Sequence, residues 1–143
     1  MPERPGGLTK TGIVGALTAL AFLGTLVIRV PIPATTGYFN IGDIFVVLAA
    51  LWLGPLAGLT VGAIGPALAD AVGFPQFILA TAVTKGVEGF VVGVVAGPTQ
   101  EVSGRKVVAA LLGGATVVAG YFVFEAFVYP ALAVDFPFFA VTD

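Results

Sequence analysis

The stretch from Thr36 to Gly97 is almost wholly apolar, yet it contains four ionisable residues, Asp43, Asp70, Lys85 and Glu88. The whole chain is 58% hydrophobic and only 10% charged, whereas a soluble domain is about 25% charged. A soluble fold of this composition would expose large apolar patches. Charge inside a lipid-spanning helix is costly and is usually turned inwards. The sequence therefore predicts a membrane protein with a polar interior.

Two missing residue types narrow the classes of function. The chain has no cysteine and no histidine, which removes disulfides, thiol chemistry, the commonest metal ligand and the commonest general base. The net charge of −2 gives no basic face for nucleic acid, and no G-x-x-x-x-G-K-[ST] nucleotide loop occurs. We therefore expect no enzyme activity, no cofactor, no metal and no nucleic-acid partner. Active transport would need an ion gradient or another polypeptide.

Glycine and proline divide the chain, which we interpret as one domain, into five apolar segments. Pro31 and Pro130, which lack the amide proton that a helix needs, end the first segment and the fifth. Most segments approach the roughly 20 residues that span a bilayer, and the short second one suggests a tilted or partly sunken helix. The sequence predicts an all-α, polytopic membrane helix bundle with transmembrane helices at residues 11–30, 38–53, 56–72, 76–96 and 107–129.

Basic residues predict how these helices are oriented. If the N-terminus is cytoplasmic, then Arg4, Lys10, Arg105 and Lys106 all lie on the cytoplasmic side, and Arg29 alone lies at an outer end. That bias follows the positive-inside rule. We expect a multi-pass protein of the cell membrane with a cytoplasmic N-terminus, and we interpret the first apolar run as a retained helix rather than a cleaved signal peptide.

Polar residues on the fourth segment share one helix face. Thr81, Lys85 and Glu88 are spaced four and three residues apart. Lys85 could pair with Glu88, or it could meet Asp70 from the third segment. Either pair could simply fix helix register, whereas the functional interpretation has Lys85 or Glu88 contact a polar ligand.

Other polar residues also have two interpretations. Asp43 could cap the helix that begins near Ile44, and Asn40 lies beside it. Tyr38 could be an interfacial aromatic or could cover a ligand. Glu125, which shares a face with Tyr121, could line a site or be solvated at the outer boundary. On the first segment, small residues at four-residue spacing predict a face that another helix can approach closely: Gly12, Gly15, Ala16 and Ala19.

Several motifs together point to a family. The order of ATTGYFNIGD, LWLGPLAG, VGAIGPALAD and ATAVTKGVEGFVVG resembles the substrate-binding S components of energy-coupling factor (ECF) vitamin transporters, most closely the riboflavin-transporter type. The resemblance covers residues 8–129. It implies a prokaryotic six-helix bundle that binds a vitamin at the outer side and associates with a transmembrane coupling protein and two cytoplasmic ATPase subunits.

The resemblance also implies roles for individual residues. The small residues on the first segment would dock the coupling protein, and Asp43 and Asp70 would be structural. Glu88 joins the implied ligand contacts because it shares a face with Lys85. The expected substrate-binding residues are Tyr38, Asn40, Gln76, Thr81, Lys85, Glu88, Tyr121 and Glu125.

One feature departs from the family pattern, and one alternative function remains open. The family has a sixth helix and a cytoplasmic C-terminus, whereas five helices are visible here and Asp143 falls on the outer side. The expected ligand is a vitamin or precursor that is riboflavin-like or related to thiamin or pyridoxine. The alternative is a stand-alone, ion-coupled secondary transporter that uses Asp70, Lys85 and Glu88 as a relay, although the inverted repeat expected of such a protein is not evident.

Overall fold

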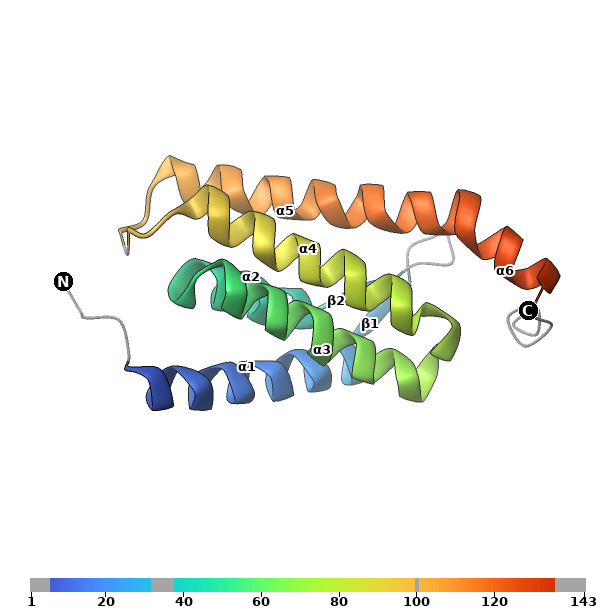
Figure 1. Ribbon diagram of the computed structural model, residues 1–143, viewed down its shortest axis with the longest axis horizontal. Helices are drawn as coiled ribbons and strands as arrows, with labels where there is room; N and C mark the ends of the chain where they lie inside the picture. Colours follow the sequence, from blue (N-terminus) through green and yellow to red (C-terminus); the bar gives the residue numbers. More distant parts are fainter. Residues whose placement is uncertain (1–5, 32–37, 100, 136–143) are drawn as a thin grey trace.

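The computed structural model describes residues 6–31, 38–99 and 101–135, and these are mostly helical (Figure 1). Two short strands and a turn of 3-10 helix join the longer helices. In chain order the elements are α1 (Gly7–Val27), β1 (Arg29–Pro31), β2 (Tyr38–Asn40), α2 (Gly42–Leu53), α3 (Pro55–Gly73), η1 (Pro75–Phe77), α4 (Ile78–Ala96), α5 (Gly104–Val123), η2 (Phe124–Val128) and α6 (Tyr129–Asp135).

Four long helical stretches form the bundle, and the short helix α2 packs against three of them. α4 packs between α3 and α5, while α1 lies on α3, and α2 contacts α1, α3 and α4. Within the described residues, four stretches are long and apolar enough to cross a membrane: Gly7–Val27, Pro55–Gly73, Pro75–Ala96 and Gly104–Leu132. The predicted all-α membrane bundle is confirmed.

Glycines let α3 and α4 approach closely. A Cβ atom at Gly58 would collide with the backbone of Gly89, and one at Gly62 would collide with the carbonyl of Lys85. Small residues at such crossings allow backbone contact between membrane helices. The crossing draws the face of α4 that carries Lys85 into the centre of the bundle.

The predicted end of the first helix and the predicted start of the second were both wrong. α1 ends at Val27 rather than at residue 30, and α2 begins at Gly42 rather than at residue 38. Residues 29–31 and 38–40 instead form an antiparallel two-stranded sheet, the β1–β2 hairpin, with Arg29 opposite Asn40. Pairing between the strands supplies hydrogen bonds that a helix would otherwise make.

The end of the fifth predicted helix was also wrong. The helix does not stop at Pro130 but runs through the π-helical turn η2 into α6, which ends at Asp135. In the wider turn the amide of Tyr129 donates to the carbonyl of Phe124, five residues earlier. A π turn therefore takes the chain past a proline that could not donate to the carbonyl four residues back. The same helix begins at Gly104 rather than at residue 107.

Basic residues gather at one end of the bundle. The start of α1, the α2–α3 turn and the α4–α5 loop lie at that end, whereas the α3–α4 turn and α6 lie at the opposite end (Figure 1). Lys10, Arg105 and Lys106 belong to the first turns of α1 and α5, and Arg105 donates to the carbonyl of Val95 near the end of α4. Arg29 lies towards the other end. The predicted grouping of charges agrees with this arrangement. Arg4 lies outside the described residues.

Candidate ligand-binding site

The helix α2 is too short to cross a membrane by itself. Its 12 residues extend only about 18 Å at 1.5 Å per residue, whereas the hydrocarbon core is about 30 Å thick. Since α2 ends beside the α2–α3 turn at one surface, its first turn lies at an interior depth. Asp43 is in that first turn, where the positive end of the helix dipole favours a carboxylate.

Asp43, Lys85 and Glu88 form a buried ionic group, here called the Lys85 cluster. The Nζ atom of Lys85 lies 2.6 Å from Oδ2 of Asp43 and 3.4 Å from Oε2 of Glu88. The Lys85 and Glu88 side chains are 3% and 4% exposed, and that of Asp43 is 21% exposed. The predicted Lys85–Glu88 pair is therefore present. Lys85 also pairs with Asp43 of α2, a partner from another helix that the sequence analysis did not consider.

A second buried group, here called the Asp70 chain, links α3, α4 and α5. The Thr81 hydroxyl donates to Oδ2 of Asp70 at 2.5 Å. Because that uses its only proton, the 2.8 Å contact between Thr81 and Tyr121 has the Tyr121 hydroxyl as donor. The Tyr121 ring also lies 6.0 Å from Nζ of Lys85. The Asp70 chain and the Lys85 cluster are therefore neighbours in one polar interior.

Arg29 ties the β1–β2 hairpin to the ends of α1 and α3. Its guanidinium donates from Nε to the carbonyl of Thr25 and from Nη2 to that of Ala69, and it stacks on the Phe74 ring at 4.9 Å. A cation near the last carbonyls of a helix is stabilising. The sequence analysis treated Arg29 only as a boundary charge and so missed this role, which depends on contacts with distant residues.

The structure brings only some of the predicted polar residues together. Thr81, Lys85, Glu88 and Tyr121 meet in the polar interior with Asp43 and Asp70. Asn40 is buried at the base of the hairpin, where its Oδ1 accepts a hydrogen bond from Thr25 at 3.1 Å. Asp43 is not the N-cap residue of α2, which is Ile41, and its Oδ2 pairs with Lys85.

The remaining predicted residues lie away from the Lys85 cluster. Gln76 is buried in η1, and Glu125 is half-buried in the π turn. Tyr38 belongs to β2, but its side chain lies outside the part that the structure describes.

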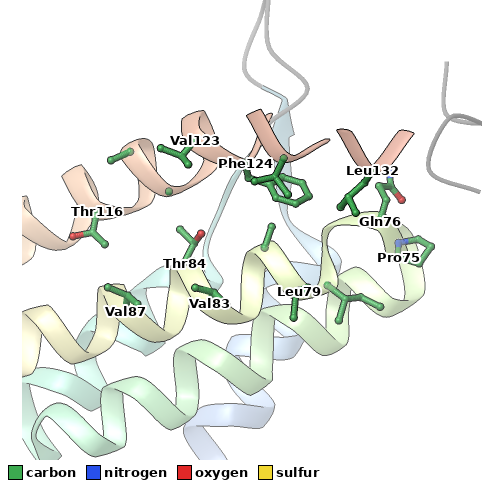
Figure 2. Close-up of a pocket in the computed structure, with 15 residues that line it drawn as sticks. Pro75, Gln76, Leu79, Val83, Thr84, Val87, Thr116, Val123, Phe124 and Leu132 are labelled. Atoms are coloured by element: carbon green, nitrogen blue, oxygen red, sulfur yellow. The ribbon is translucent and has the colours of Figure 1, made fainter. Parts of the chain in front are cut away.

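An apolar groove of about 910 Å³ runs between α4 and the helix formed by α5, η2 and α6 (Figure 2). Leu79, Val83 and Val87 line it from α4, and Val123 and Phe124 line it from the facing helix. Its few polar lining residues are Gln76, Thr84 and Thr116. Of the predicted ligand contacts, Gln76 alone is among the lining residues.

Thr84 and Gly120, which both line the groove, meet where α4 packs on α5. A Cβ atom at Gly120 would meet the Thr84 side chain, so the two residues are in close contact where α4 and α5 cross. Leu79 is 74% exposed, and this side of the groove faces outwards from the bundle. In a membrane-spanning protein such an apolar face suits contact with lipid.

The small residues of α1 face away from the bundle. Gly12, Gly15, Ala16 and Ala19 are all exposed, and a Cβ atom at either glycine would meet nothing within 4 Å. The buried residues of α1 are Leu17, Ala21 and Thr25, at four-residue spacing on another face. The small residues therefore form a free stripe, here called the α1 stripe, rather than a contact within the bundle.

The interior presents charged and hydroxyl side chains from α2, α4 and α5. Among the described residues there is no group of three or more acidic, histidine or cysteine side chains that could hold a metal. A multi-pass helical bundle with charged side chains at membrane depth defines a class of protein, the polytopic membrane proteins that handle polar solutes.

Comparison with known proteins identifies the family within that class. A model of the ECF-type riboflavin transporter S components matches residues 8–140, and the chain belongs to this family. The resemblance seen in the motifs is confirmed, and the family is not one of enzymes.

A relative in Pyrococcus woesei, which bears the name "Uncharacterized protein in gap 3'region", is 45% identical over 97 residues. The match covers 68% of this chain and 65% of the relative. The chain thus spans just under two thirds of the relative's length, and the name of the relative assigns no activity.

Proposed function

We propose that this chain is the substrate-binding S component of an ECF-type importer. It captures a vitamin or vitamin precursor at the outer membrane face for ATP-driven uptake. The Lys85 cluster is the observation that carries this proposal. Ionised side chains at membrane depth are costly and are kept mainly where they serve a solute, and this cluster lies where α2 stops short of the outer face and leaves Asp43 partly exposed.

The proposed ligand site is the polar interior below the β1–β2 hairpin. Lys85, Glu88, Thr81 and Tyr121 supply charged and hydroxyl groups from α4 and α5, and Asn40 lies at the base of the hairpin. Binding sites of this kind combine apolar walls with a few placed polar groups. Tyr38, Gln76 and Glu125 would contact more distal parts of the ligand, and Asp70 would hold the site together through Thr81.

The α1 stripe is the proposed docking face for the transmembrane coupling protein, which works with two cytoplasmic ATPase subunits. Gly12, Gly15, Ala16 and Ala19 are exposed and smooth, and such faces allow close helix approach in lipid. The N-terminus would be cytoplasmic in a prokaryotic cell membrane, because Lys10, Arg105 and Lys106 share one end of the bundle.

Reconstitution tests this function directly. Proteoliposomes that contain the chain, the coupling protein and the ATPases should take up the vitamin only when ATP is inside. Gly15→Leu with Ala16→Leu should abolish association with the coupling protein while ligand binding persists, since both positions are exposed on α1. Val118→Leu on the exposed face of α5 is the control. Uptake that persists without partners and follows a proton or sodium gradient would establish the secondary transporter instead.

A further inference from the structure

Two oxygen atoms in the Lys85 cluster have no hydrogen-bond donor among the described residues. They are Oδ1 of Asp43 and Oε2 of Glu88, and both atoms are buried. Lys85 satisfies the other oxygen of Asp43 at 2.6 Å but lies 3.4 Å from Oε2 of Glu88, beyond the usual length of a charge-assisted bond. A buried acceptor without a donor is destabilising, so these atoms call for a partner.

The cluster is also unbalanced in charge. Two carboxyl groups, from Asp43 and Glu88, face one ammonium group, from Lys85. A low-dielectric interior strongly disfavours an unmatched charge. The missing group must be a proton, a cation or a donor of hydrogen bonds, and a second anion would make the imbalance worse.

We propose that the ligand of this site is a neutral or cationic molecule that presents N–H or O–H donors to Asp43 and Glu88. This inference rests on the proposed function, because it specifies the substrate class of the same site. Phosphorylated or carboxylated forms of the ligand are excluded from this end of the site by repulsion from the two carboxylates.

The route of approach agrees with the assignment. Asp43 is the most exposed member of the cluster, and it lies at the end of α2 beside the hairpin. A ligand entering there would meet Asp43 first and Glu88 below it. The α4–α5 groove could hold only an apolar part of a ligand, because its lining is almost wholly apolar.

The first experiment identifies the bound molecule. The chain is purified in mild detergent, and any co-purified small molecule is identified by mass spectrometry. A neutral or cationic molecule with N–H or O–H donors supports the inference. A phosphorylated or carboxylated molecule overturns it while the proposed function stands. If no vitamin co-purifies and none binds on titration, the proposed function itself fails, and the inference fails with it.

The second experiment measures selectivity with matched probes, namely riboflavin, thiamin and pyridoxine, each beside its phosphate ester. For the probe that binds, the ester should bind about 100-fold more weakly, because it brings a like charge to the cluster. Glu88→Gln should weaken the free form and reduce the discrimination about tenfold. Equal affinity for the two forms in the unaltered protein overturns the inference, and this result needs no variant to fold.

Matched variants assign the selectivity to the cluster. Asp43→Asn provides a second removal of charge if Glu88→Gln fails to fold. Glu101→Gln, at an exposed position in the α4–α5 loop, is the control and should leave both affinities unchanged. If the preference for the free form over its ester is the same in all three variants and in the unaltered protein, then the group that discriminates lies outside the cluster. That result overturns the inference.

Discussion

Two buried acidic centres lie side by side in this bundle, and they differ in how their carboxylates are partnered. Asp70 receives a 2.5 Å hydrogen bond from Thr81, which Tyr121 in turn supports. Glu88 in the Lys85 cluster is equally buried, but its nearest cation is 3.4 Å away and its Oε2 has no donor among the described residues. We therefore expect Asp70 to stabilise the bundle and the Lys85 cluster to contact the proposed ligand.

The difference follows from which elements meet at each centre. The Asp70 chain joins three long helices, α3, α4 and α5, whose side chains can interlock along their length. The Lys85 cluster forms where α2 begins, in the interior of the bundle, so Asp43 reaches it from the N-terminus of a helix. A terminus can shift or admit a solute with less loss of packing than the middle of a long helix. Four substitutions test this contrast between the Asp70 chain and the Lys85 cluster.

The largest effect is expected from Lys85→Met. It leaves Asp43 and Glu88 buried without a cation, and breaking a buried pair in this way costs about 3–5 kcal/mol of unfolding free energy. Ligand binding should be lost as well. Denaturant unfolding in detergent measures the first effect, and ligand titration measures the second.

Two further variants control the Lys85→Met result. Lys106→Met, in the first turn of α5, removes a charge outside the interior and should change stability little. Lys85→Met combined with Glu88→Gln should recover part of the lost stability. A loss below about 1 kcal/mol, the size expected of an exposed pair, would contradict the burial of the cluster.

Asp70→Asn should destabilise the fold but spare the ligand. Asparagine keeps the shape yet weakens the bond from Thr81, and the expected cost is about 1–3 kcal/mol. Ligand affinity should change by less than about threefold. The same unfolding and titration assays measure both. A variant with full stability and no ligand binding would make Asp70 a ligand contact and erase the contrast between the two centres.

A smaller effect is expected from Tyr121→Phe. The variant removes the hydroxyl that donates to Thr81 but keeps the ring near Lys85, so a loss of about 1 kcal/mol is expected. A double-mutant cycle with Thr81→Val isolates the bond. Coupling near zero would mean that the Asp70 chain does not extend to α5.

The smallest effect is expected from Val83→Trp, which fills the α4–α5 groove at an exposed position. Stability should stay within about 0.5 kcal/mol, and ligand affinity should be unchanged, because the groove lies outside the polar interior. Val94→Trp, at an exposed position of α4 outside the groove lining, is the matched control. Loss of binding in Val83→Trp alone would move the ligand site into the groove.

Local patterns in the sequence predicted much of the fold. The apolar segments gave α3 and α4 closely, because Gly54-Pro55, Gly73 and Gly97 mark their ends. Periodicity suggested the Lys85–Glu88 pair as one of two alternatives, since residues three apart in a helix are neighbours. The hairpin was missed because strands of three residues are too short to show alternation. The end of the fifth helix was wrongly predicted at Pro130 because a π turn leaves no local pattern.

The sequence by itself determined that this chain is an all-α membrane protein with charge turned inwards, because apolar length and helical spacing are properties of each segment alone. Its ordered motifs carried the resemblance to the S component family, which the family comparison confirmed. Only the tertiary structure decided that Lys85 meets Asp43, that Thr81 joins Asp70 to Tyr121, and that the α1 stripe stays free. Those contacts depend on the glycine crossing of α3 with α4 and on the depth at which α2 begins. Both are relations between segments far apart in the chain, which no local pattern encodes.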